Sequence, residues 1–234
     1  MSALRHVRAF SFEASPVSAL FGCALAFTLT TSCHSSSDAV DPRVNVSRIS
    51  VELAFDRATP GDMPSGVSAL SGQWKIASDD SAPSPKNAFV MTTGAEKQPY
   101  NLALLDDVKL ADVEASVKLR ALAGEIDQGG GLVWRAKDAQ NYYLTRWNPL
   151  ENNLRLYKVI DGERIQLASE TVHAGAGWHE LKIVAKGEQL RVSLDGRARL
   201  SAKDGSFREA GKVGVWTKAD AQTAFDDLKV AAPK

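Results

Sequence analysis

The sequence predicts an all-β fold, a two-sheet antiparallel jelly-roll sandwich, for residues 49–234. Short segments of alternating apolar and polar residues recur along this range, and this period is typical of a half-buried β-strand. Turn sequences containing Gly and Pro separate the segments, and no long helical period occurs. About a dozen strands with short connections favour two packed antiparallel sheets. A β-propeller would need a repeated blade motif, and the sequence has no internal repeat.

Residues 1–33 are predicted to be a leader that does not belong to the sandwich. Arg5 and Arg8 give it a basic head, residues 17–31 (VSALFGCALAFTLTT) are mostly apolar, and a small residue precedes Cys33. This order is typical of an export signal. The apolar run is shorter than the roughly 20 residues that a membrane-spanning helix needs. A buried core helix is the alternative interpretation.

The end of the leader, LTTSC at residues 29–33, resembles a bacterial lipobox, in which the cysteine becomes the lipidated first residue after cleavage. Thr30 stands where that motif usually has Leu. We therefore expect lipidation at Cys33 and membrane contact only through that anchor. Cleavage to a periplasmic or secreted protein is the alternative, and Cys23, inside the apolar run, is a weaker lipidation candidate.

The rest of the chain is expected to be a tethered, electrically neutral domain without disulfides. Both cysteines fall in the leader, so stability must come from an apolar core. Residues 34–48 (HSSSDAVDPRVNVSR) are rich in Ser and Asp and lack periodicity, as flexible tethers do. The chain carries 28 Lys and Arg against 28 Asp and Glu, so no nucleic-acid partner is expected.

Strands are predicted in chain order between these turns. Val113–Ala121 is the clearest, because Val113 and Val117 share one face while Glu114 and Lys118 share the other. Out-of-phase apolar residues predict a β-bulge at Asp226–Asp227 in the last strand. The other predicted strands are Val51–Phe55, Gln73–Ala77, Asn87–Thr92, Tyr100–Leu105, Leu181–Ala185, Leu190–Leu194, Arg197–Leu200, Gly211–Thr217 and Phe225–Val230.

Residues 129–169 are expected to hold four strands and to concentrate aromatic and cationic side chains. Turns are predicted at 136–140, at 149–153 and at Asp161-Gly162, a dipeptide typical of a tight hairpin. On the pleated surface of a sheet, such side chains form either a dense core or a flat sugar-binding face.

Four segments carry a resemblance to a known group of proteins. They are GGGLVWRAKDAQNYYLTRW, LYKVIDGERIQL, WHELKIVAKGEQLRVSLDGR and GKVGVWTKADAQTAFDDLKV. They resemble the concanavalin A-like lectin/glucanase superfamily and, within it, laminin-G-like and 3-keto-disaccharide hydrolase domains. The resemblance covers roughly Gln73 to Val230. It implies a curved jelly roll whose concave sheet commonly holds carbohydrate.

A catalytic carboxylate set is not evident. The glucanases of this superfamily use a Glu-x-Asp-x-x-Glu run on one strand, and this chain offers Glu125-Ile-Asp127 followed by Gln128 and two glycines. We interpret Glu125 and Asp127 as loop carboxylates, and the catalytic residues, if any exist, stay unassigned.

Two clusters are candidates for ligand binding. The first comprises Arg135, Asn141, Tyr143, Arg146 and Glu151, because Arg and Glu bind sugar hydroxyls while a Tyr ring stacks on a pyranose. The second, at a strand end leading into a loop, comprises Trp216, Lys218 and Asp220. The alternative is that the aromatic residues form the core and the charged residues pair on the surface.

No cofactor and no metal is expected. The four histidines, His6, His34, His173 and His179, are scattered, and no cluster has metal-ligand spacing. Asp79–Asp80 and Asp226–Asp227 are the candidates for a structural calcium site of the kind such sandwiches sometimes have.

The first functional hypothesis is an exported, cell-envelope, carbohydrate-binding sandwich without its own catalysis. The second is an enzyme that hydrolyses glycosides, of the 3-keto-disaccharide type that the resemblance implies. The third is a protein-interaction module of laminin-G type. Binding without turnover would separate the first from the second, and absence of both would favour the third.

Overall fold

The computed structural model describes residues 50–94 and 99–234. The predictions of a leader, of lipidation at Cys33 and of a tether concern residues outside this range. The described residues form one compact unit. In its described part there are fifteen strands and no helix, so none that could cross a membrane.

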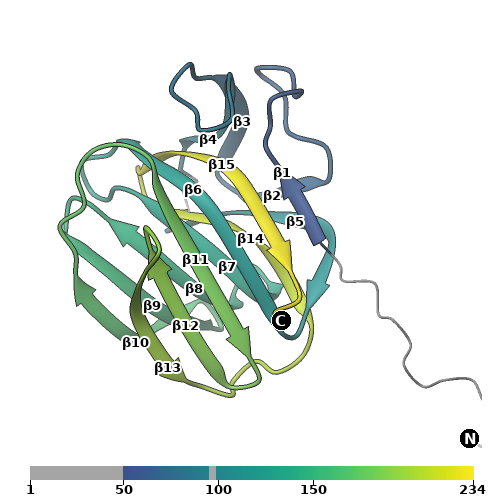
Figure 1. Ribbon diagram of the computed structural model, residues 1–234, viewed down its shortest axis with the longest axis vertical. Helices are drawn as coiled ribbons and strands as arrows, with labels where there is room; N and C mark the ends of the chain where they lie inside the picture. Colours follow the sequence, from purple (N-terminus) through teal and green to yellow (C-terminus); the bar gives the residue numbers. More distant parts are fainter. Residues whose placement is uncertain (1–49, 95–98) are drawn as a thin grey trace, which may run out of the picture. The chain divides into compact units, whose positions relative to one another are not determined.

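The strands form two antiparallel sheets that pack face to face (Figure 1). The eight-stranded sheet runs in the order β13 (Arg197–Lys203), β12 (Gln189–Leu194), β11 (His179–Lys186), β6 (Val113–Ala123), β15 (Gln222–Ala231), β4 (Asn87–Thr93) and β3 (Gln73–Ser78), with β1 (Ser50–Leu53) also paired to β15. The seven-stranded sheet runs in the order β10 (Glu163–Thr171), β9 (Asn153–Ile160), β8 (Asn141–Asn148), β7 (Gly130–Asp138), β14 (Gly211–Lys218), β5 (Tyr100–Leu110) and β2 (Val67–Ser71). The predicted all-β jelly-roll sandwich is confirmed.

Apolar side chains from both sheets fill the space between them. In β6, Val113, Val117 and Leu119 point into this core and are fully buried, as the alternation predicts. Trp134 and Tyr143 enter from the seven-stranded sheet with ring centroids 5.6 Å apart. Each buried aliphatic side chain contributes roughly 1.5–3 kcal/mol, so the core supplies the stability that disulfides provide in smaller domains.

The predicted turns and bulge are present. Asp161 and Gly162 have φ of 51° and 82°, which is the left-handed pair that a type I′ hairpin requires. The pairing of β15 with β6 changes register between Asp226 and Lys229, and Asp227 has φ of 47° at this bulge.

Two features at the start of the domain differ from the prediction. β1 ends at Leu53 rather than Phe55, because Phe55 adopts a left-handed φ of 59° that ends the strand. β2 was not predicted, because this edge strand, VSALS, buries only Val67 fully and lacks an alternating apolar face.

Candidate functional site

The outer face of the seven-stranded sheet is apolar, although it faces away from the sandwich core. A second cluster of buried side chains covers it, separate from the cluster between the sheets: Leu102, Leu104, Val133, Ala136, Tyr142, Leu144, Tyr157, Val159 and Trp216. The outer face of an antiparallel sheet is ordinarily polar. Each side chain of this second cluster is at most 3% exposed, so the outer face carries a packed apolar layer of its own that needs an explanation.

This outer face is concave. The guanidinium carbon of Arg164, in β10, lies 5.7 Å from the ring centroid of Tyr100, in β5, and 4.4 Å from that of Tyr157. β10 and β5 are five strand intervals apart, which is about 24 Å in a flat sheet. Two side chains do not bridge that distance, so the sheet must be bent toward this face.

Strand register lines up one row of residues across the middle of the concave face. Arg155 pairs with Arg146, Arg146 with Gly131, and Gly131 with Trp216. A Cβ at Gly131 would lie 1.7 Å from the carbonyl oxygen of Thr145, so only glycine fits. The row therefore has no side chain at its position between Arg146 and Trp216.

Beside this row, Asp127 accepts two hydrogen bonds and forms an ion pair. Its carboxylate accepts a hydrogen bond from Lys218 Nζ at 2.7 Å and one from Asn148 Nδ2 at 2.7 Å. Arg146 Nη1 lies 3.5 Å from the same group. The side chains of Asp127 and Arg146 are both 1% exposed, so this is a buried ion pair with polar support.

Glu151 joins Arg146 from the other side. Its Oε2 accepts from Arg146 Nη2 at 2.9 Å and from Asn153 Nδ2 at 2.9 Å, and it lies 3.3 Å from Arg155 Nη1. The hydrogen bond from Asn153, together with the charges of Arg146 and Arg155, holds the pKa of Glu151 below its usual range. Glu151 is therefore an ionised hydrogen-bond acceptor in neutral solution.

Asp220 fixes the loop that carries Asp127. Its carboxylate accepts hydrogen bonds from the backbone N–H groups of Glu125, Ile126 and Asp127, at 2.7 to 3.2 Å. Burial raises the pKa of Asp220, but these backbone donors outweigh it and the pKa falls below its ordinary value. The contact ties the loop after β6 to the end of β14.

Unpaired buried donors concentrate at this site. In the described part of the chain, nine buried side-chain nitrogen and oxygen atoms have no hydrogen-bond partner. Five of them lie on the concave face: Arg146 Nε, Arg146 Nη1, Arg155 Nε, Arg164 Nη1 and Asn153 Oδ1. Buried polar groups are rarely left unpaired, so each one needs an explanation.

Five of the eight predicted ligand-binding residues belong to this region. Arg146, Glu151 and Lys218 are members of the charged network, Asp220 supports it, and Trp216 lies in the apolar floor. The indole N–H of Trp216 points to the Tyr142 hydroxyl at 3.3 Å.

The other three predicted residues lie elsewhere and hold the fold together. Arg135 is fully buried and donates to the carbonyls of Ala111, Phe207 and Gly187. Tyr143 lies in the core between the sheets and donates to Asp204 Oδ1 at 2.6 Å; burial raises its pKa to about 12. Asn141 binds Asp138 and Asp161 in the turns of neighbouring hairpins.

The sequence analysis missed part of the network. Asp127 does lie in a loop, as interpreted, but it is buried and paired rather than solvated. Arg155 and Tyr157 lie on β9, next to the strand of Arg146, and Arg164 lies on β10, one strand further. All three belong to the predicted cationic, aromatic stretch. Cross-strand pairing of Arg146 with Arg155 was the signal that could have found them.

At least one residue of each candidate calcium pair has a protein partner. Asp79 pairs with Arg120 at 2.7 Å, and Asp226 accepts from Ser84 N at 2.9 Å. Within residues 50–94 and 99–234, no group of three or more His, Cys, Asp or Glu is placed to hold a metal ion.

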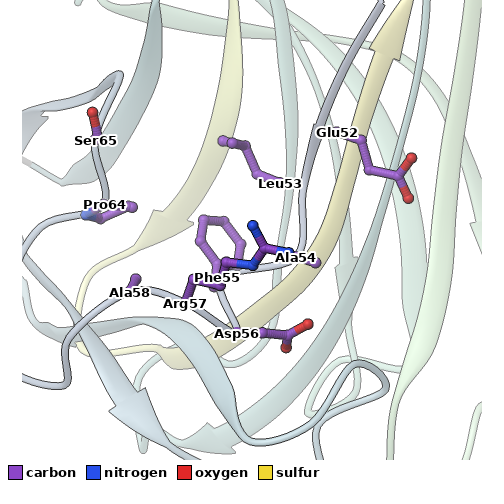
Figure 2. Close-up of a pocket in the computed structure, with 9 residues that line it drawn as sticks. All are labelled: Glu52, Leu53, Ala54, Phe55, Asp56, Arg57, Ala58, Pro64 and Ser65. Carbon is purple, nitrogen blue, oxygen red and sulfur yellow. The ribbon is translucent and has the colours of Figure 1, made fainter.

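A separate hollow of about 550 Å³ lies beside β1 (Figure 2). Figure 2 shows the Phe55 ring near Leu53, Ala58 and Pro64, with the Glu52 carboxylate turned away from the ring. That carboxylate pairs with Lys229 at 2.6 Å. None of the described residues that line this hollow has an unpaired buried polar atom, so the concave face is the better candidate.

No protein-family model matches this sequence, and a search of curated proteins finds no relative. Solved structures do resemble it. The carbohydrate binding module CBM66 from Bacillus subtilis superimposes with a TM-score of 0.58 at 21% identity, covering 70% of this chain and 94% of that one. The GH43 BlXynB protein from Bacillus licheniformis gives 0.57 at 16% identity, covering 78% of this chain and 39% of that one.

A Bacillus subtilis protein of unknown function with a galectin-like fold gives a TM-score of 0.53 at 10% identity, covering 71% of this chain and 89% of that one. At these identities the likeness establishes the fold and not the activity. The narrower resemblance to laminin-G-like and 3-keto-disaccharide hydrolase domains stays a prediction. The chain thus has a jelly-roll sandwich, the fold that it shares with these three structures.

Proposed function

We propose that this protein binds carbohydrate on the concave face of its seven-stranded sheet. The observation that carries the proposal is a charged network with unpaired donors beside an apolar, aromatic floor on a bent sheet. Sugar rings present an apolar face and a rim of hydroxyls, so their sites combine a ring-stacking surface with fixed polar groups. The concave face offers both within one row of paired residues.

Each part of the face has a role in this proposal. Tyr100, which is partly exposed, provides the ring-stacking surface. The ring of Tyr157 is 3% exposed and lies against Arg164, so it supports that guanidinium from below. Glu151, ionised and partly exposed, accepts hydrogen bonds from sugar hydroxyls. Arg155 and Lys218 donate to ring and hydroxyl oxygens, and Asp127 holds Lys218 and Arg146 in place.

The fold of the neighbours supports the same proposal. One is described as a carbohydrate binding module and another as a GH43 protein, and both share the sandwich. Export to the cell envelope, with a lipid anchor at Cys33, is also our proposal; its support is the pattern of residues 1–33.

A hydrolytic enzyme is the weaker candidate. Glycoside hydrolysis needs a protonated carboxylic acid whose pKa is raised. The pKa of Glu151 is instead lowered, by Asn153 and by the charges of two arginines. Asp127 is likewise engaged by Lys218 and Arg146. This arrangement favours binding without catalysis.

Isothermal titration of the full chain against a panel of soluble oligosaccharides tests the proposal, with turnover assays on the same sugars and on 3-keto-glycosides. We expect binding without turnover, and we expect Lys218→Ala and Tyr100→Ala each to weaken it at least fivefold. Arg191→Ala, an exposed cation on the other sheet, is the matched control and should leave affinity unchanged. Absence of binding to every sugar, or equal loss in the control, would refute the proposal and favour a protein-interaction module.

A further inference from the structure

We infer that the concave face takes a negatively charged sugar residue, such as a uronate, rather than a neutral one. The inference rests on the proposed carbohydrate binding and specifies the class of ligand. Its starting point is the balance of charge on the face. Beyond the network already described, Arg164 adds a positive charge whose contacts are the rings of Tyr157 and Tyr100.

The concave face carries more positive than negative groups. Its cations are Arg146, Arg155, Arg164 and Lys218, and its buried or partly buried carboxylates are Asp127 and Glu151. Asp220, at the rim, is directed at three backbone N–H groups, and counting it still leaves an excess of positive charge. Arg164 has no carboxylate partner in the described part of the chain.

The unpaired polar atoms also favour a negatively charged ligand. Four of the five are guanidinium nitrogens, which only donate, and one is an amide oxygen. Arg146 is 1% exposed, so these atoms are buried: its Nε has no partner, and its Nη1 lies 3.5 Å from Asp127 without a hydrogen bond. A neutral sugar hydroxyl donates as readily as it accepts, whereas a carboxylate only accepts and binds two guanidinium donors at once.

The site already binds one carboxylate of its own. Three donors, from Arg146, Asn153 and Arg155, converge on a single oxygen of Glu151. This geometry shows that the guanidinium groups of β8 and β9 are positioned for an anionic oxygen. Arg155 Nε, on the same side chain, remains without an acceptor in the described chain. A ligand carboxylate between Arg155 and Arg164 would pair these donors and balance the excess charge.

The test is calorimetric titration of the full chain with four probes: a galacturonate hexasaccharide, its methyl ester, a sulfated oligosaccharide and a neutral oligosaccharide. We expect tight binding of an anionic probe, at least tenfold loss on methyl esterification, and weakening as NaCl is raised from about 50 to 500 mM. The carboxylated and sulfated probes distinguish the two sources of negative charge, and binding of either supports the inference.

Arg164→Gln and Arg155→Gln should each reduce affinity for the anionic probe about fivefold or more, with melting temperature measured alongside. Arg191→Gln, on the other sheet, should not. If a variant fails to fold, the inference can still be tested, because the salt dependence of binding is measured on the unmodified protein. Equal binding of neutral and anionic probes, without salt dependence, overturns the inference while carbohydrate binding stands. Binding of no probe and of no other sugar refutes the proposed function itself.

Discussion

Arg146 reaches the concave face because strand alternation is undisturbed in β8. Leu144 and Tyr142, two and four residues earlier, lie in the apolar floor of the same face. The sequence alone could therefore predict Arg146 and its partner Glu151. Arg135 could not be placed in this way, because a register shift and a φ of 49° turn it out of the alternation and toward backbone carbonyls. Such local breaks depend on the partner strand, which the sequence of one strand does not reveal.

The burial of Arg146 gives it a structural role in addition to its proposed role in binding. We expect Arg146→Ala to lower the free energy of unfolding by about 3 kcal/mol, because removing one member of a buried ion pair leaves the other charges uncompensated. The loss stays at the lower end of the usual range, since Lys218 still neutralises Asp127 and Arg155 still faces Glu151. Urea unfolding measures it, with Arg191→Ala as control. A loss below about 1 kcal/mol would contradict the buried pair.

The carboxyl group of Asp204 makes the stability of the folded domain depend on pH. Burial raises its pKa, but hydrogen bonds from Lys158, Tyr143 and Ser206 outweigh this and hold the pKa well below its usual range. A carboxyl with a lowered folded-state pKa stabilises the fold above its unfolded pKa of about 3.9, and this contribution is lost as the pH falls below that value.

Asp204→Asn should therefore be less stable than the unmodified protein at pH 7 and should lose less stability on acidification to pH 3. Thermal melting between pH 3 and 7 measures both differences. Parallel curves for the two proteins would show that Asp204 is not responsible for the acid sensitivity.

At the scale of single elements, β7 and β8 approach each other closely within the bent seven-stranded sheet. Gly131 marks this contact, because any Cβ there would meet the backbone of β8. The sequence predicted both strands and the turn between them, but not the bend. Bending arises from how seven strands pair with one another, and no local pattern encodes it.

Gly131→Ala should therefore destabilise the domain by about 3 kcal/mol or more, which is the upper part of the range for overpacked cores. The cost is high because the backbone of β8, rather than a flexible side chain, would have to move. Gly175→Ala is the matched control, because a Cβ there meets nothing within 4 Å. Urea unfolding of the two variants compares them. Similar stability of both would mean that β7 and β8 are not held as close as the structure has them.

At the scale of the whole molecule, the sandwich could be predicted because alternation and turn dipeptides recur in almost every element. Sheet order and the second apolar cluster could not, since they depend on contacts between strands distant in the sequence. Trp216 of β14 and Tyr142 of β8, for example, meet on the concave face although 74 residues separate them. The fold alone does not indicate which face binds a ligand, and the unpaired donors of β8, β9 and β10 are the reason for proposing the concave one.

The most direct test of this account is the mapping of backbone amide chemical shifts during titration with an oligosaccharide that binds. We predict the largest changes at Gly131, Arg155, Arg164 and Lys218, which lie on four strands of the concave face. Amides of β11 and β12, in the other sheet, should not move. Changes confined to the eight-stranded sheet, or to the hollow around Phe55, would contradict the concave-face site.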